Sequence, residues 1–398
     1  MWSFPSRAAL IAAAVAVLVT GCSHAPWSSS SGGVDVAKLD VGTYSTAPRT
    51  VRDQPSPPEG ALLEGIRMAE AVADSSQFDP PLFYRWQADP VPDTASLIPV
   101  LGQAGQQVLD RHGWIAGYRA SYADHPQLNN GAAPPSYIGL AIMLLRFPDE
   151  AAASGAASGL ETSNWKDVSL TTAVPLPKHP EVTGRYTPGT GALFADTAIG
   201  PFAVHLMLDT PPAELQNHAD ILDAALDAEH TLVNSFHPTP PTDIPTLPRD
   251  PDHLLARMVS TDPAHQPPVS PNFAVYGPIG ALRDQTPKIR EDKLYEKWGV
   301  DRLAISGDQR LYRLRDHHAA LDMLAEFSAE SSAPVHAIDA DPKVPDEHCV
   351  QTDNPITGTP AFACRMVVNN FYTLIHADAA ASAKQEAAAQ YVLLAAHG

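Results

Sequence analysis

The pattern of apolar and polar residues divides the beginning of the 398-residue chain into three unlike stretches. Residues 8–19 are an almost unbroken apolar run, whereas residues 23–58 are rich in Ser, Gly, Thr and Pro and show no sustained apolar period. From Glu59 to about Asp74, apolar residues recur at the three- and four-residue spacing of a helix. The pattern therefore predicts a flexible tether over residues 22–58 and folded structure from Glu59 onward.

Two later stretches resemble each other and indicate an internal repeat. An apolar run over residues 137–147 leads into an Ala-rich helix, and a shorter run over residues 311–314 leads into a second helix. Arg146-Phe147-Pro148-Asp149 matches Arg313-Leu314-Arg315-Asp316 at a spacing of 167 residues. In both copies the Asp occupies an N-cap position, where its carboxylate can accept hydrogen bonds from the first helical N–H groups.

The repeat continues in the second part of each copy. Residues 193–208 and 362–376 each contain two strand-like runs, which are separated by Gly200-Pro201 in the first copy and by Asn369-Asn370 in the second. A helix follows each pair of strands, and these helices align at a spacing of 169 residues. The predicted helices cover residues 213–228 and 379–396. We therefore predict an α+β fold of two tandem domains, each ordered strand, helix, antiparallel strands, helix. Chance similarity between Ala-rich helices is the alternative.

A proline-rich stretch separates the two copies. Residues 236–251 contain six Pro, which favours a stiff, extended connector. We place the boundary near residue 240, which gives an N-terminal domain of residues 59–240 and a C-terminal domain of residues 241–398.

Charge and composition narrow the possible partners. Lys and Arg number 26 against 45 Asp and Glu, which gives a formal net charge of −19. Because nucleic acids are bound mainly through basic surfaces, this acidic balance argues against nucleic acid as a partner. Apolar residues make up 44% of the chain, enough to form cores, while charged residues make up only 18% and Pro residues number 39. Low charge and high Pro are typical of an extracytoplasmic chain with rigid loops.

The amino terminus predicts the location of the protein. Arg7 precedes the apolar run, whose 12 residues are too few to cross a hydrocarbon core that needs about 20. A short apolar segment behind one positive charge is typical of a secretory signal. The following Leu18-Val19-Thr20-Gly21-Cys22 resembles the bacterial lipobox, which implies cleavage between Gly21 and Cys22 and a diacylglyceryl group on the Cys22 sulfur.

We therefore expect residues 1–21 to be a lipoprotein signal peptide and the mature protein to be extracytoplasmic. Its N-terminal lipid would anchor it to the cell membrane, because each buried methylene contributes about 0.8 kcal/mol to membrane binding. An ordinary secretory peptide that is cut elsewhere, with Cys22 incidental, is the alternative.

The two remaining cysteines, Cys349 and Cys364, allow one intramolecular pairing. An envelope location permits oxidation, and Asp353-Asn354-Pro355 and Gly358 are turn formers that can bring the two cysteines together. We predict a Cys349–Cys364 disulfide. Two buried thiols are the alternative, and a zinc site that adds His348 lacks a fourth ligand at a suitable spacing.

Motifs for catalysis are absent from the sequence. It contains no Gly-x-Ser-x-Gly, no phosphate-binding Gly-x-x-x-x-Gly-Lys and no His-Glu-x-x-His. Ser163-x-x-Lys166 matches the spacing found in penicillin-binding enzymes, but no Ser-Asp-Asn or Lys-Thr-Gly follows it. His318 and Asp322 stand one helical turn apart, a possible metal pair, although we expect His317 and His318 to lie in an exposed first turn. We therefore assign no catalytic, cofactor-binding or metal-binding residue.

Two further features predict packing. His205 lies within an apolar strand-like run, which indicates a half-buried side chain with a hydrogen-bond partner. Trp114, Tyr118 and Tyr122 stand at even spacing, so they should share one face of a strand and enter the core. The alternative is that these aromatic side chains line a pocket or a partner surface.

Several stretches, taken in order, resemble a family of uncharacterised actinobacterial lipoproteins that is abundant in mycobacteria and nocardiae. The stretches that carry the resemblance are Gly21-Cys22, Gly42-x-Tyr44-x-Thr46-x-Pro48-Arg49, Arg67-Met68-Ala69, Leu144-Leu145-Arg146-Phe147-Pro148-Asp149, Asp250-Pro251-Asp252-His253-Leu254-Leu255-Ala256-Arg257 and Gly299-Val300-Asp301-Arg302. The resemblance implies a lipid-anchored envelope protein with two linked α+β domains of unknown function. It supplies no catalytic residue.

The expected function is therefore non-enzymatic: a lipid-anchored envelope protein that binds either a small apolar or lipid ligand or an envelope protein partner. Tandem domains favour a pocket where they meet. An envelope hydrolase is one alternative, because a Ser/His/Asp site can be assembled from distant residues. A passive surface or structural lipoprotein is the other.

Overall fold

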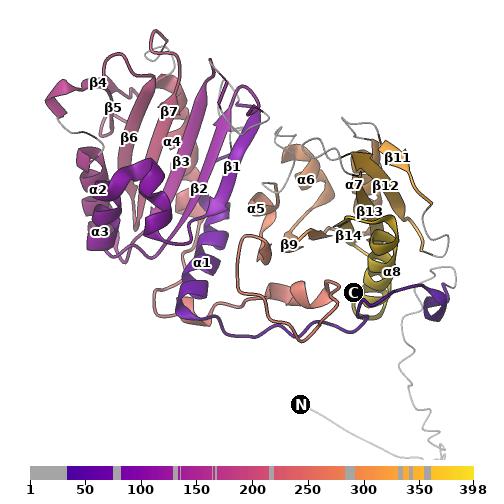
Figure 1. The fold of residues 1–398 in the computed structure, drawn as a ribbon. Coiled ribbons are helices and arrows are strands. Elements are labelled where there is room, and N and C mark those ends of the chain that lie inside the picture. The colour runs from indigo at the N-terminus through magenta and orange to yellow at the C-terminus, as the bar shows by residue number, and fades with distance from the viewer. Residues whose placement is uncertain are drawn as a thin grey trace, which may run out of the picture. The chain divides into compact units, whose positions relative to one another are not determined.

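A computed structural model shows two antiparallel sheets of seven strands each (Figure 1). It describes residues 34–74, 82–128, 133–134, 136–163, 165, 168–214, 219–282, 292–329, 335–339, 344–353 and 360–398. Residues 36–398 form one compact unit, and Gly21 and Cys22 lie outside the described residues.

The first sheet has the spatial order β1-β2-β3-β7-β6-β5-β4. Its strands are β1 (Tyr84–Pro90), β2 (Ala116–Ala123), β3 (Gly139–Arg146), β4 (Thr172–Pro175), β5 (Thr183–Tyr186), β6 (Ala192–Ile199) and β7 (Phe202–Asp209). The second sheet has the order β8-β9-β10-β14-β13-β12-β11 when it is followed from its other edge. Its strands are β8 (Phe273–Tyr276), β9 (Arg302–Ser306), β10 (Gln309–Arg313), β11 (Val335–Ala337), β12 (His348–Asp353), β13 (Pro360–Val368) and β14 (Phe371–Ala377). Strand by strand, the two orders are the same.

Helices occupy matching places between these strands. The α-helices are α1 (Pro57–Met68), α2 (Ile98–Arg111), α3 (Glu150–Ser163), α4 (Ala219–Ser235), α5 (Pro278–Leu282), α6 (Asp292–Trp298), α7 (His317–Ala329) and α8 (Ala380–His397). Short 3₁₀ helices are η1 (Val36–Lys38), η2 (Ala69–Ala71), η4 (Thr94–Leu97), η5 (Val168–Leu170), η7 (Ile244–Thr246), η8 (Pro251–His253) and η9 (Leu255–Arg257). Helix α3 follows β3 as α7 follows β10, and α4 and α8 each follow the last strand of their sheet.

Register and capping confirm the predicted duplication. Arg146 pairs with Phe202 across β3 and β7, and the equivalent Arg313 pairs with Phe371 across β10 and β14. The predicted N-caps form in both copies: the Asp149 carboxylate accepts a hydrogen bond from the Ala152 N–H at 2.8 Å, and the Asp316 carboxylate accepts one from the Ala319 N–H at 2.8 Å.

The predicted hairpin turns also form in both copies. Gly200, between β6 and β7, has a φ of +54°, and Asn369, between β13 and β14, has a φ of +55°. Both residue types tolerate this left-handed backbone, which suits tight hairpin turns. The two spacings of 167 and 169 residues therefore reflect one shared topology.

The first sheet is covered by helices on both faces (Figure 1). Alternate residues of its central strands pack with α4 and η2 on one face and with α2 and α3 on the other, as the period of two in a strand requires. Leu144 and Val204 belong to the first cluster, and Leu145 and Ala203 to the second.

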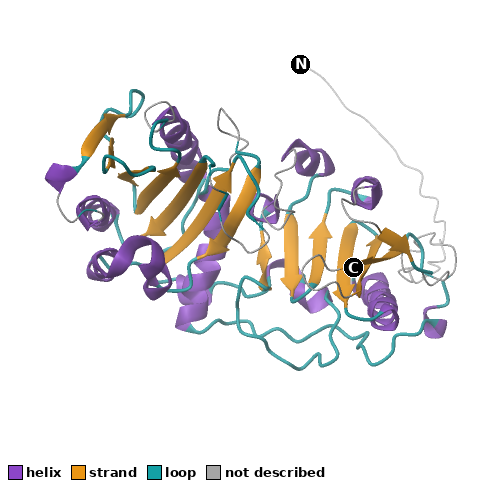
Figure 2. Cartoon of the chain, turned by 45° about the horizontal axis from the view of Figure 1, so that its top comes forward, coloured by secondary structure: helices purple, strands orange, loops and turns teal. Residues whose placement is uncertain are grey.

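The second sheet is covered in the same way, and Figure 2 shows helices on both sides of its strands. One face packs with α6 and α7 and also receives Leu62, Leu63 and Ile66 of α1. Helix α8 contacts β13 and β14. Helix α1 therefore contributes apolar side chains to the core of the C-terminal domain, while the η2 turn that follows it enters the core of the N-terminal domain.

The interpretation of residues 22–58 as a flexible tether is wrong for the segment from Val36 to Ser56. The Ser45 N–H donates to the Ser260 carbonyl and the Arg49 N–H to the Ala256 carbonyl, both at 2.9 Å. The Arg49 side chain is 7% exposed and donates to Ser306 Oγ at 3.1 Å. Backbone hydrogen bonds and the buried Arg49 side chain hold this segment in place, although it has no apolar period. Apolar periodicity alone therefore could not predict that the segment is ordered.

The proline-rich connector is also not the extended spacer that its composition suggests. Its η7 turn packs against α1, and Arg249 at its end is only 1% exposed and lies 3.1 Å from Glu59. Burial would raise the pKa of Glu59, but hydrogen bonds from Ser56 and the Val269 N–H and the charge of Arg249 lower it to about 2. The prolines thus shape a packed turn beside α1.

Two packing predictions need correction. Tyr118 and Tyr122 do share one buried face of β2, each with 1% exposure. Trp114, however, precedes the strand and packs with the cluster on the opposite face. His205 is fully rather than half buried, and its Nδ1 lies 2.8 Å from the Asp196 carboxylate.

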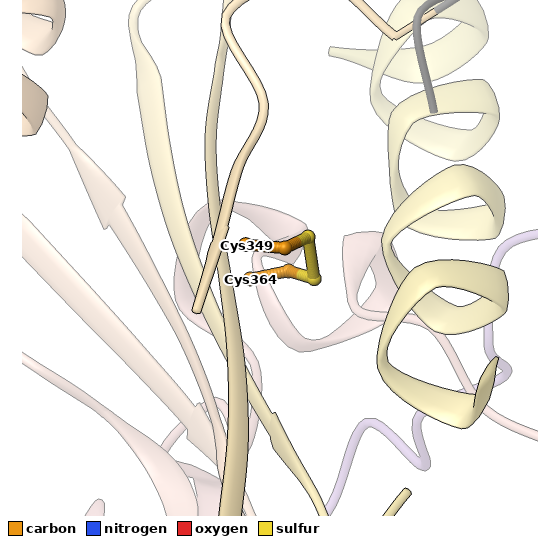
Figure 3. The surroundings of a disulfide bond; sticks show 2 residues. All are labelled: Cys349 and Cys364. Carbon is orange, nitrogen blue, oxygen red and sulfur yellow. A yellow bond between two sulfur atoms is a disulfide. The ribbon is translucent and has the colours of Figure 1, made fainter. Parts of the chain in front are cut away.

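The predicted disulfide joins Cys349 and Cys364, which lie directly opposite each other on β12 and β13. Figure 3 shows its sulfur atoms on the side of the sheet that faces α8. Because both thiols are taken up in this bond, they cannot serve as thiolate ligands to zinc beside His348.

Candidate functional site

A cavity of about 600 Å³ lies beside α1. Its volume falls within the range of about 300–1,000 Å³ that is usual for small-molecule sites. Residues from α1 and η2, the end of α4, the connector, the β8–α5 region and β9 line it. These residues are Leu63, Ile66, Arg67, Glu70, Leu232, Ser235, Phe236, His237, Leu247, Pro248, Pro251, Val275, Tyr276, Gly277, Ile279 and Arg302.

The walls of the cavity are mainly apolar. Ile66 of α1, Phe236 after α4 and Tyr276 of β8 approach it from three different elements. Helix α1 has apolar residues on more than one side, and it packs against both the first sheet and β8. A ligand here would bury apolar surface, which is favourable by roughly 25 cal/mol per Å².

Arg67 places a guanidinium group in the lining. It donates to the Glu64 carboxylate at 2.7 Å and to the His237 carbonyl at 3.1 Å. The same group lies over the Phe236 ring, 5.4 Å from the ring centroid, in a cation–π arrangement. The side chain is 40% exposed, so it is held in place while still reaching solvent.

Behind Arg67, a buried network fixes the position of α1. The Glu64 side chain is fully buried and accepts hydrogen bonds from Arg146 of β3 and from the N–H and hydroxyl of Thr239, the latter two at 3.1 and 2.8 Å. Burial lowers the pKa of Arg146, and the charge of Glu64 opposes that shift. The network joins the helix, the first sheet and the connector on one side of the cavity.

Two further charged groups line the cavity. The Glu70 carboxylate accepts hydrogen bonds from the N–H groups of Ile279 and Gly280, at 3.2 and 2.8 Å, and so caps α5. Arg302 Nε lies 3.3 Å from the Asp252 carboxylate, and this guanidinium also donates to the Asp301 carbonyl. Two cationic groups and one anionic group therefore border an apolar interior.

Ser235, His237 and Glu70 all line the cavity, so it contains the residue types of a hydrolytic triad. Two of these side chains bond to backbone groups. The Ser235 hydroxyl donates to the Leu232 carbonyl at 2.8 Å, and Glu70 accepts from the amides of α5.

The other candidates from the sequence do not reach the cavity lining. Ser163 ends α3 and donates its hydroxyl proton to the Leu160 carbonyl, while Lys166 lies outside the described residues. His317 and His318 are exposed at the start of α7, as predicted.

The sequence analysis expects a pocket where the tandem domains meet, but it does not identify the lining residues, which are spread from residue 63 to residue 302. One signal was present: Arg67, Pro251 and Arg302 belong to three of the stretches that carry the lipoprotein resemblance.

Comparison with family models assigns both halves of the chain. Residues 51–249 match "Domain of unknown function (DUF7373) N-terminal", and residues 254–397 match "Domain of unknown function (DUF7373) C-terminal". The chain belongs to the DUF7373 family. The division between the two DUF7373 regions, at residues 249–254, falls shortly after the boundary that we place near residue 240.

Other comparisons add little to this DUF7373 assignment. No curated protein matches the chain. The structure described as "DynU16 crystal structure, a putative protein in the dynemicin biosynthetic locus" is 9% identical, with 87% of this chain and 94% of that chain covered. Its TM-score is 0.12, so it supports no conclusion about fold or function. Within the described residues, no helix has the length and apolar character needed to cross a membrane.

Proposed function

We propose that this protein is a lipid-anchored extracytoplasmic binding protein that holds a small amphipathic molecule in the cavity beside α1. The observation that supports this proposal is the apolar lining with Arg67 and Arg302 at its border. The apolar walls suit a hydrocarbon or ring body, and the guanidinium groups suit one anionic group such as a carboxylate or phosphate. The lipid anchor of the proposal depends on the lipobox-like sequence that ends in Cys22.

Ligand binding can be tested by filling the cavity. Replacing Ser235 by Trp should weaken binding of a fluorescent fatty-acid analogue by about tenfold or more. Displacing two methylenes removes about 1.6 kcal/mol of burial, and a tenfold change in affinity corresponds to about 1.4 kcal/mol. Asn234→Trp is the matched control, because Asn234 is an exposed neighbour on α4 that does not line the cavity. Fluorescence titration of the full chain in detergent measures both affinities.

Three results would contradict the binding proposal. In the first, the unmodified chain does not bind the probe, and in the second, both Trp variants weaken binding equally. In the third, native mass spectrometry of protein purified from the envelope gives the mass of the acylated chain alone, without a bound molecule. The uncharged alcohol analogue of the probe tests the guanidinium groups, and we expect it to bind more weakly than the acid. Turnover of an ester probe that depends on Ser235 would favour the hydrolase alternative.

Membrane attachment has a separate test. We expect Cys22→Ser to move the protein from the detergent phase to the aqueous phase in detergent partitioning, because serine cannot form the thioether to diacylglyceryl. Ser30→Ala, which leaves the lipobox-like sequence intact, should stay in the detergent phase. A Cys22→Ser protein that still enters the detergent phase would contradict the anchoring proposal and leave the binding proposal standing.

A further inference from the structure

A second cluster of polar side chains lies where the loop between β4 and β5 meets α4. The loop is held at both ends, because Leu176 and Val182 are buried in the core of the N-terminal domain. Between them, the His179 N–H donates to the Leu176 carbonyl at 3.1 Å and the Val182 N–H donates to the His179 carbonyl at 2.9 Å. These turns fix the backbone of His179, whose side chain is 10% exposed.

Four side chains converge at this place. His179 Nε2 lies 3.0 Å from one carboxylate oxygen of Asp227 on α4, and His179 Nδ1 lies 3.5 Å from the Glu181 carboxylate. His230 stands three residues after Asp227, and its ring is parallel to that of His179 with the centroids 5.2 Å apart. Ligand atoms of His179, Glu181 and His230 all lie within 4.8 Å of one another.

The two contacts of His179 impose a conflict on a neutral imidazole ring. Such a ring has one N–H donor and one lone-pair acceptor. If Asp227 accepts the proton on Nε2, then Nδ1 directs its lone pair at Glu181, which is an acceptor too. Either a second proton on the ring or a cation between Nδ1 and the carboxylate removes the repulsion.

The spacing favours a cation. The 3.5 Å from Nδ1 to the Glu181 oxygen is at the outer limit for a hydrogen bond. Two ligands of a tetrahedral zinc ion, each bonded at about 2.0–2.1 Å, lie about 3.3–3.4 Å apart. The Nδ1 and carboxylate oxygen are therefore already near the separation that a shared zinc ion requires.

Asp227 has the place of an outer carboxylate partner. A histidine that ligates zinc usually donates its other N–H to a carboxylate, which fixes the ring and raises its basicity. The second Asp227 oxygen is engaged by Lys178 Nζ at 2.9 Å, so the first remains directed at His179. Glu181 is 61% exposed, which leaves an approach from solvent.

We propose that His179, Glu181 and His230 bind a Zn²⁺ ion once the His230 ring has turned out of its parallel stack on His179, with Asp227 orienting His179 and water completing the coordination. Two imidazoles and one carboxylate form a donor set that suits zinc rather than Ca²⁺ or Mg²⁺, which take oxygen ligands. The site shares α4 with the cavity but none of its lining residues, so it does not depend on the proposed ligand binding.

The test is zinc titration of the full chain in detergent after treatment with a chelator. Isothermal calorimetry should give one Zn²⁺ per chain, and Ca²⁺ and Mg²⁺ should not compete. His230→Gln and Glu181→Gln should each weaken zinc binding at least about tenfold, and Asp227→Asn should weaken it by about 10–100-fold. His317→Gln is the matched control, because His317 is an exposed histidine of α7 and does not belong to the proposed site. The zinc affinity of this variant should equal that of the unmodified chain.

His179 is too buried for its own substitution to separate loss of zinc binding from loss of folding. The test therefore uses His230 and Glu181, and folding is monitored in the same samples. Circular dichroism spectra of the His230→Gln and Glu181→Gln proteins should match that of the unmodified chain. Visible absorption of the Co²⁺-loaded chain should show the intense bands of low coordination number and lose them in the His230→Gln protein. The proposal is overturned if no stoichiometric zinc binds, or if both ligand variants bind as tightly as the control.

Discussion

Replacing Glu64 by Gln should lower the free energy of unfolding by about 3–5 kcal/mol, the range found when one partner of a buried ion pair is removed. Glu64 is fully buried, and Arg146 beside it is 3% exposed. The amide keeps the shape of the side chain but removes the charge that compensates the guanidinium. Urea denaturation of the full chain, followed by circular dichroism, measures the change.

The matched control is Glu161→Gln. Glu161 accepts from Arg185 Nε at 2.9 Å, but its side chain is 40% exposed. Because exposed pairs contribute about 0–1 kcal/mol, this variant should unfold almost as the unmodified chain does. Adding Arg146→Met to Glu64→Gln should restore part of the loss, since the buried charge is then gone. A loss below about 1 kcal/mol for Glu64→Gln would show that the network has no such role.

Removing the disulfide is the second large effect that we expect. In the chain-entropy model, closing a loop of about 15 residues stabilises a protein by about 3 kcal/mol, because the unfolded chain loses freedom. The Cys349–Cys364 bond has a sequence separation of 15. A protein with both cysteines replaced by Ala should therefore unfold at a lower urea concentration by this amount.

Reduction provides the control for this prediction. A thiol reductant should destabilise the unmodified protein by a similar amount and leave the doubly substituted protein unchanged. If the reductant has no effect on the unmodified protein under conditions in which mass spectrometry shows free thiols, the bond does not stabilise the fold as predicted.

The tandem fold could be predicted from the sequence because its longest elements repeat local signals. The Asp149 and Asp316 caps, the Gly200 and Asn369 turns and the alternating apolar positions between them depend on residues close together in the chain. Such signals survive in a single sequence. These local signals are sufficient to align the two copies without knowledge of the strand order in either sheet.

The short strands at or next to the sheet edges could not be predicted in this way. Strands β4 and β5 have four residues each, too few to show a period, and β8 has four buried residues without alternation. Similarly, the segment around Arg49 is held by partners more than 200 residues away, at Val259 and Ser306. The residues next to Arg49 in the sequence do not indicate which distant residues it contacts.

The candidate sites illustrate the same limit. His179-x-Glu181 and Asp227-x-x-His230 are each unremarkable patterns, and 48 residues separate the first His from the Asp. Only the packing of the β4–β5 loop on α4 brings them together. The cavity likewise needs α1, α4 and β8 in place before its lining exists.

The placement of the segment around Arg49 has a consequence for biosynthesis. A ribosome makes this stretch early, yet its partners at Ala256, Val259 and Ser306 are made some 200 residues later. The apolar residues of α1 share a core cluster with Trp298 and Tyr312, which are also made much later than the helix. The N-terminal half therefore cannot complete its folding before the C-terminal half is made. A fragment that ends at the connector would leave the apolar side of α1 exposed to solvent. Such a fragment should be cleaved by proteases more readily than the complete chain.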